Sequence, residues 1–176
     1  PCMPFIKIFI PKKFHSNRTI IHSVSSIIIV AFIILTITLS FVPIFLFIDF
    51  LEGACVMFYS SLAAIGYLLV LKFSKSLNAC GHYFTFQSIV VCLSMMYFTG
   101  GVSSPYLIWL FCICPVLFIY FKEKIALFWV GITIISFLTF AMAQIFGYHL
   151  EQQLTPTVFN VTWTVNFCLA LFIFVN

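Results

Sequence analysis

The chain has 176 residues with a formal net charge of +4, and 64% of its residues are hydrophobic whereas 7% are charged. A soluble domain of this length does not need so much apolar surface, so the composition excludes a soluble globular protein and indicates a membrane protein. Lipid-exposed backbone must satisfy its own hydrogen bonds, which favours helices. The apolar runs do not alternate as the short strands of a β-barrel do, so we expect an all-α fold.

The first 19 residues mix apolar and basic side chains. They form either an amphipathic arm on the lipid headgroups or a short basic arm before the first span. The sequence starts with Pro-Cys-Met-Pro rather than Met, so we expect it to be part of a longer protein. A signal peptide is not evident, because the first apolar run is too long and lacks a small-residue cleavage site.

Residues 20–176 are expected to form one membrane domain, because each apolar run approaches the roughly 20 helical residues that cross a bilayer. Pro43 is expected to end the first span. Residues 44–53, which carry Asp49 and Glu52, are then a short connection or a re-entrant segment. Residues 148–157 read as a polar loop. The six expected spans are about 20–41, 54–71, 80–98, 106–121, 125–147 and 158–176.

The basic residues predict the orientation of these six spans. All eight Lys and Arg fall on one side of the membrane if the spans alternate. The opposite side has Asp49, Glu52 and Glu151 and no basic residue. By the positive-inside rule the basic side is cytoplasmic, so both termini are expected in the cytoplasm.

The segment 97–109 is an uncharged break in the apolar sequence that is rich in turn-forming residues. Gly100 and Gly101 can adopt a positive φ without steric cost. Pro105 suits the first turn of a helix, and Ser104 before it is the expected N-cap. We therefore expect one helix to end near Phe98 and the next to begin near Pro105. This turn faces outward in the predicted orientation.

Residues 99–106 read Thr-Gly-Gly-Val-Ser-Ser-Pro-Tyr, with Trp109 and a mid-span Pro115 following. This pattern resembles the TGGxxSP signature of six-helix membrane input domains of bacterial receptors, which precede histidine kinase or nucleotide cyclase modules. The resemblance implies a homodimeric receptor in the bacterial inner membrane, whose last span continues as a signalling helix into a cytoplasmic module. The chain itself contains none of the catalytic motifs of those modules, so no catalytic residue is expected in it.

The turn has two interpretations, a tight connection or a site for a small amphipathic ligand at the bilayer surface. The residues alone do not decide between them. The resemblance to a receptor domain favours the second, with Pro115 weakening the following helix so that it can move. The acidic residues on the same side bind a cation or amine, or simply keep their segments outside. The expected ligand-binding residues are Gly100, Gly101, Ser103, Ser104, Pro105, Tyr106 and Trp109, with Asp49, Glu52 and Glu151 as secondary candidates.

Metal or cofactor binding is not expected. The seven cysteines show no CxxC pattern and read as small apolar side chains. His22 and His82 lie near the cytoplasmic ends of two spans and are interpreted as interfacial residues, with a haem or metal pair as the alternative. Gln87 and Gln144 are expected to join helices through interhelical hydrogen bonds.

The function predicted from the sequence is signal reception by a membrane domain. Its expected partners are the lipid bilayer, a second copy of the chain and a cytoplasmic signalling module, and no nucleic acid is expected to bind. The alternative is a structural subunit of a membrane complex or a small transporter. A transporter needs polar groups near mid-bilayer and usually an internal repeat, and neither is evident. An intramembrane enzyme would need a catalytic pair within the spans, and none is apparent.

Overall fold

The computed structural model describes residues 18–74, 76–146, 160, 162 and 164. These residues form helices and turns and no β-strand, which confirms the all-α prediction for the described part of the chain. The elements are α1 (Arg18–Phe47), α2 (Leu51–Ser74), α3 (Leu77–Phe98), the short 3₁₀ turn η3 (Gly101–Ser103), α4 (Leu107–Tyr120) and α5 (Glu123–Ile145).

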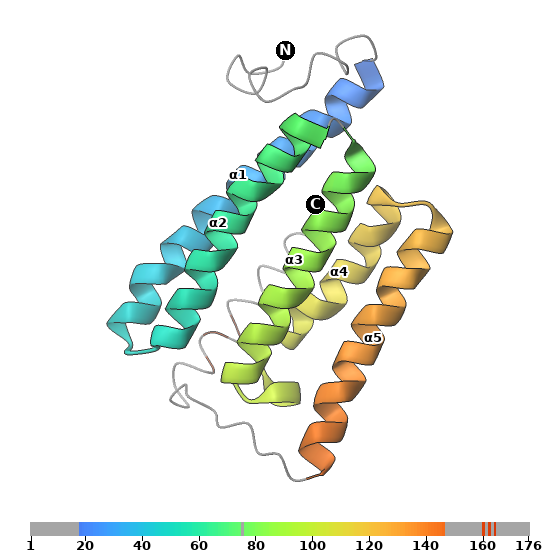
Figure 1. The fold of residues 1–176 in the computed structure, drawn as a ribbon. Coiled ribbons are helices and arrows are strands. Elements are labelled where there is room, and N and C mark those ends of the chain that lie inside the picture. The colour runs from blue at the N-terminus through green and yellow to red at the C-terminus, as the bar shows by residue number, and fades with distance from the viewer. Residues whose placement is uncertain (1–17, 75, 147–159, 161, 163, 165–176) are drawn as a thin grey trace.

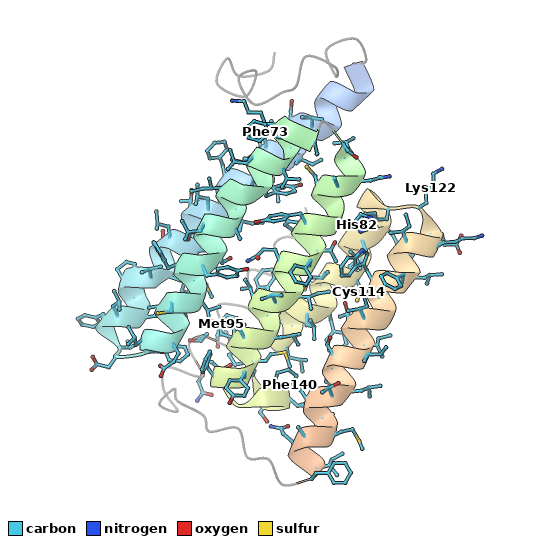
Figure 2. The ribbon with its side chains drawn as sticks, in the orientation of Figure 1. Phe73, His82, Met95, Cys114, Lys122 and Phe140 are labelled. Atoms are coloured by element: carbon cyan, nitrogen blue, oxygen red, sulfur yellow. The ribbon has the colours of Figure 1, made fainter. Side chains whose placement is uncertain are left out.

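The helices run up and down, and each packs against the next one in the chain (Figure 1). We call the end of the bundle where α1 and α5 begin and α2 ends the basic end, because it carries Arg18, Lys72, Lys122 and Lys124. Figure 2 labels Lys122 there. The opposite end, called the turn end, has the α1–α2 connection, η3 and the end of α5. The charge asymmetry expected from the sequence is therefore present in space among the described residues.

Four described helices are long and apolar enough to cross a membrane: Ile27–Phe47 within α1, then α2, α3 and α5. Their bounds lie within a few residues of the predicted second, third and fifth spans. The predicted fourth span corresponds to α4, whose 14 residues extend only about 21 Å. The predicted arm at 1–17, the loop at 148–157 and most of the sixth span lie outside the described residues.

The predicted end of the first span at Pro43 is wrong, and so is the assignment of 44–53 to a connection. The helix α1 continues through Pro43 to Phe47, and α2 already begins at Leu51. Proline removes only one hydrogen bond near the end of the helix. The residues after it still bury Phe45, which is 1% exposed, so packing outweighs the local penalty.

The α1–α2 connection is a Schellman motif. Phe50 N–H donates to the Phe45 carbonyl at 2.9 Å and Asp49 N–H donates to the Leu46 carbonyl at 3.3 Å. The Phe45 and Phe50 rings meet edge to face, 5.3 Å apart, which supplies the apolar contact of the motif. Asp49 has a φ of 56°, a left-handed conformation that aspartate tolerates better than most residues. The chain therefore reverses in three residues.

Two buried apolar clusters hold the bundle together. One lies toward the basic end, where Val24 and Ile28 of α1 meet Leu71 of α2 and Cys80 of α3. The other joins all five helices and lies mostly toward the turn end, where it includes Met95 of α3 (Figure 2), but it also reaches Phe121 and Ala126 near the basic end. Large apolar side chains also cover the outside of α1, α2 and α5, which fits helices surrounded by lipid.

Small polar residues bring α1 and α2 close together. The hydroxyls of Thr38 and Ser61 are 2.9 Å apart and join the two helices. Ser60 and Ala64, four residues apart, are both buried on α2. Small residues at this spacing permit close approach of helices in membranes.

Candidate functional site

The connection between α3 and α4 is built on two consecutive left-handed glycines. The helix α3 ends at Phe98, as predicted, and Thr99 occupies its C-cap. Gly100 has φ 100° and ψ 25°, and Gly101 has φ 65°. An L-residue rarely adopts such angles, so both positions favour glycine, and Gly100 does so more strongly because its φ lies beyond the left-handed region open to L-residues. The predicted role of this pair as the turning point is confirmed.

A buried hydroxyl pair holds this turn closed. The Thr99 hydroxyl donates to the Met95 carbonyl of the preceding helical turn and contacts the Ser104 hydroxyl. Thr99 is fully buried and Ser104 is 2% exposed. The Ser104 hydroxyl also accepts the Tyr106 N–H at 3.1 Å. Each buried hydroxyl therefore has a partner, which is what makes such a network rigid rather than costly.

The predicted start of the fourth helix near Pro105 lies within two residues of the observed one, but the predicted N-cap is wrong. The helix α4 begins at Leu107, and Ser104 is not its N-cap. Instead, Leu107 N–H donates to the Ser104 carbonyl at 3.1 Å, which makes Pro105 the second residue of a β-turn. Proline is favoured there for the same reason as at a helix start, because its φ is fixed. The helix then runs through Pro115 without interruption.

A glutamine far away in the sequence also holds the turn. Gln144, near the end of α5, donates from Nε2 to the Gly100 carbonyl at 2.9 Å. The same carbonyl accepts the Ser103 N–H at 3.3 Å, so it is bonded both to η3 and to α5. The sequence predicted that Gln144 joins helices, and here it joins a helix to the turn.

A surface pocket of about 360 Å³ lies beside the turn. Its volume is at the lower end of the range of small-molecule sites. Val102 and the two serines lie on the η3 side, side chains of α4 form the rest of the wall, and no lining residue is charged. The Ser103 hydroxyl has no hydrogen bond to another described residue and is available to a ligand. The pocket is lined by Val102, Ser103, Ser104, Leu107, Ile108 and Phe111.

Gly100 and Gly101 form the turn and do not line the pocket, and the other predicted ligand-binding residues of this segment divide into two groups. Ser103 and Ser104 line the pocket. Pro105 and Tyr106 are buried, and Trp109 packs against the apolar cluster toward the turn end. These three residues belong to the packing around the turn, and none of them lines the pocket.

The secondary candidates lie elsewhere on the turn end. Asp49 and Glu52 are both exposed on the α1–α2 connection. Asp49 adopts the left-handed conformation of the Schellman motif, and Glu52 lies in the first turn of α2, where a negative charge is favourable. Each acid thus has a structural explanation that needs no ligand. Glu151 lies outside the described residues.

A second polar contact joins α3 and α5 near the basic end. Trp129 donates its indole N–H to Nδ1 of His82 at 3.0 Å, and the Phe121 ring lies 4.6 Å from the imidazole (Figure 2 labels His82). A Cβ on Gly81 would lie 2.8 Å from the Phe121 ring, so the glycine permits this close approach. With Nδ1 accepting, the neutral imidazole carries its proton on Nε2.

This arrangement weighs against the alternative in which His82 binds haem or a metal. The nitrogen on the other side of the ring is protonated and has no free lone pair for a ligand bond. The described residues also contain no group of three or more His, Cys, Asp or Glu side chains suited to a metal ion. The His22 side chain lies outside the described part of the structure.

The apolar wall of the pocket was not predicted from the sequence. It consists of Val102, Leu107, Ile108 and Phe111. Their spacing on α4 places three of them on one side of the helix, but the whole chain is apolar and this signal does not stand out. The bond from Gln144 to the turn spans 44 residues, and no local pattern predicts it.

The chain matches no family model, and no curated protein or solved structure is significantly similar to it. The functional argument therefore depends on the geometry of the turn and on the distribution of charge.

Proposed function

We propose that this chain is a membrane sensory domain that receives a small ligand, or a change in the membrane, at the turn formed by Gly100–Pro105. The observation that carries the proposal is the construction of that turn. A rigid, buried polar network fixes its shape, an uncharged pocket opens beside it, and its backbone is bonded to a distant helix. A connection that only reverses the chain needs none of these features, as the three-residue α1–α2 connection shows.

The pocket favours an uncharged, partly apolar ligand with a hydrogen-bonding group. Its wall contains four apolar side chains and two serines. The charged residues described at this end are the acids Asp49 and Glu52, so an anion would find no basic partner there. A ligand of this kind partitions into the bilayer and can reach the pocket from the membrane.

The orientation follows from charge. The described basic residues gather at one end, which we place in the cytoplasm, and the turn end then faces outward. With a sixth span at 158–176, both termini are cytoplasmic. In this proposal the domain is a homodimer in the bacterial inner membrane, and its last span passes the signal to a histidine kinase or nucleotide cyclase module outside this chain.

Signalling requires two packings of similar energy and a ligand that prefers one of them. The test compares two Ile→Trp variants of the natural protein. Ile108→Trp fills the pocket, and Ile135→Trp places the same side chain on the outside of α5, where the isoleucine is 65% exposed. The first variant is expected to lock or abolish ligand-dependent output, and the second to respond as the wild type.

Peptide sequencing of the natural protein beyond Asn176 provides the second part of the test. A phosphorylatable histidine helix or a cyclase core supports a receptor. An end within a few residues of Asn176 would instead favour a subunit of a membrane complex or a transporter.

A further inference from the structure

The helix α5 is the least enclosed of the four candidate spans. Of the residues in its most apolar window, 11% are buried, compared with 50% in α2. Its inward side is a single stripe with residues three or four positions apart, as expected for one helix face. Only the first and third members of the stripe are fully buried. The stripe consists of Ala126, Trp129, Thr133, Phe137, Phe140 and Gln144.

Two side-chain hydrogen bonds fix this stripe near its ends. Trp129 bonds to His82 of α3 toward the basic end, and Gln144 bonds to the Gly100 carbonyl at the turn end. Between them α5 is held by apolar contacts such as that of Phe137 with Phe111, whose ring centroids are 5.5 Å apart. Apolar contacts tolerate sliding and rotation, whereas a hydrogen bond requires one geometry. The position of each half of α5 therefore depends strongly on its bond.

The bond at the turn end depends on the conformation of the turn. The Gly100 carbonyl reaches Gln144 from a left-handed backbone conformation, with φ 100° and ψ 25°. The same carbonyl also accepts the N–H of Ser103, which lines the pocket. A displacement of η3 would therefore change the carbonyl that holds α5, without any ligand touching α5.

We propose that Gln144 couples the conformation of the Gly-Gly turn to the position of the outer half of α5. The inference deepens the proposed function, because it identifies the route by which occupation of the pocket reaches the rest of the bundle. The coupling itself is a property of the unliganded protein and is tested without a ligand.

The experiment measures distances between spin labels on the full chain in lipid nanodiscs, after replacement of the seven native cysteines by alanine. One label pair, at Glu52→Cys and Phe146→Cys, reports on the turn end, because both residues are exposed there. A second pair, at Lys72→Cys and Lys124→Cys, reports on the basic end.

Two variants break the bond from opposite partners. Gln144→Leu removes the amide, and Gly100→Ala disturbs the carbonyl while leaving Gln144 intact. Gln87→Leu is the matched control, because Gln87 is also a membrane glutamine. Its buried Nε2 has no hydrogen-bond partner among the described residues, so the interhelical bond predicted for it is not present there. Loss of one hydrogen bond is expected to raise the population of the conformation in which the outer half of α5 is displaced from the turn about fivefold.

The proposal predicts a new or broadened distance at the turn end for both variants, with an unchanged distance at the basic end and no change in Gln87→Leu. Wild-type distances in Gly100→Ala would overturn the coupling, as would wild-type distances in Gln144→Leu. An equal change in Gln87→Leu or at the basic end would overturn it too, because the effect would then be general loosening. Since no ligand is present, these outcomes are independent of whether the pocket is a receptor site.

Discussion

Replacement of Gly100 by alanine tests whether the left-handed turn is a structural requirement. Gly100 has a φ of 100°, beyond the narrow left-handed region open to L-residues. The strain of an L-residue there is about 1–2 kcal/mol. Distortion that relieves the strain would weaken the bond to Gln144, at about 1 kcal/mol. We therefore expect Gly100→Ala to lower the free energy of unfolding by about 2–3 kcal/mol.

Gly131→Ala is the matched control. Gly131 lies within α5, and a Cβ built there meets no heavy atom within 4 Å. Alanine is the better helix former, so this variant is expected to gain up to about 1 kcal/mol. The same chemical change should thus have opposite signs at the two positions.

The assay is reversible unfolding in mixed micelles titrated with a denaturing detergent, followed by circular dichroism. The comparison of two Gly→Ala variants in the same medium removes the uncertainty of extrapolation to zero denaturant. If Gly100→Ala proves as stable as Gly131→Ala, the reasoning from backbone strain is refuted, and the turn needs no left-handed residue.

Three further predictions concern polar contacts away from the turn. Thr38→Val removes the hydroxyl contact between α1 and α2 and should lower the free energy of unfolding by about 0.6 kcal/mol. The control Thr36→Val should have almost no effect, because the exposed Thr36 hydroxyl bonds to a carbonyl of its own helix. Equal losses in the two variants would contradict a stabilising contact between the helices. A double-mutant cycle with His82→Leu and Trp129→Phe should give a coupling energy of about 0.6–1.7 kcal/mol, whereas additive effects would exclude the bond. Asp49→Gly should raise the free energy of unfolding by up to about 1 kcal/mol, because glycine adopts the positive φ without strain. A lower free energy of unfolding would show that the carboxylate itself stabilises the connection.

The long apolar runs predicted the helices well, because membrane thickness and backbone hydrogen bonding leave few alternatives. The glycine pair predicted the turn between α3 and α4 for an equally local reason. The error at Pro43 came from treating a local breaker as decisive, although the burial of Phe45 carries the helix onward.

The candidate site was only partly predictable. Sequence patterns identify residues able to form a turn, but they do not show which of their side chains face a pocket. Tyr106 is buried and Ser103 is not, although both lie in the same short segment. The contact of Gln144 with Gly100 depends on how α5 packs across the bundle, and this is a tertiary property.

The most direct test of the account is the side of the membrane on which the Gly-Gly turn lies. Single cysteines at Ser103 and Lys124, in the cysteine-free background, are labelled with a membrane-impermeant maleimide in intact cells and after permeabilisation. We expect Ser103→Cys to be labelled in intact cells and Lys124→Cys only after permeabilisation, because the proposed orientation places the basic end in the cytoplasm. Labelling of Lys124→Cys in intact cells, with Ser103→Cys protected, would contradict reception at an outward-facing turn.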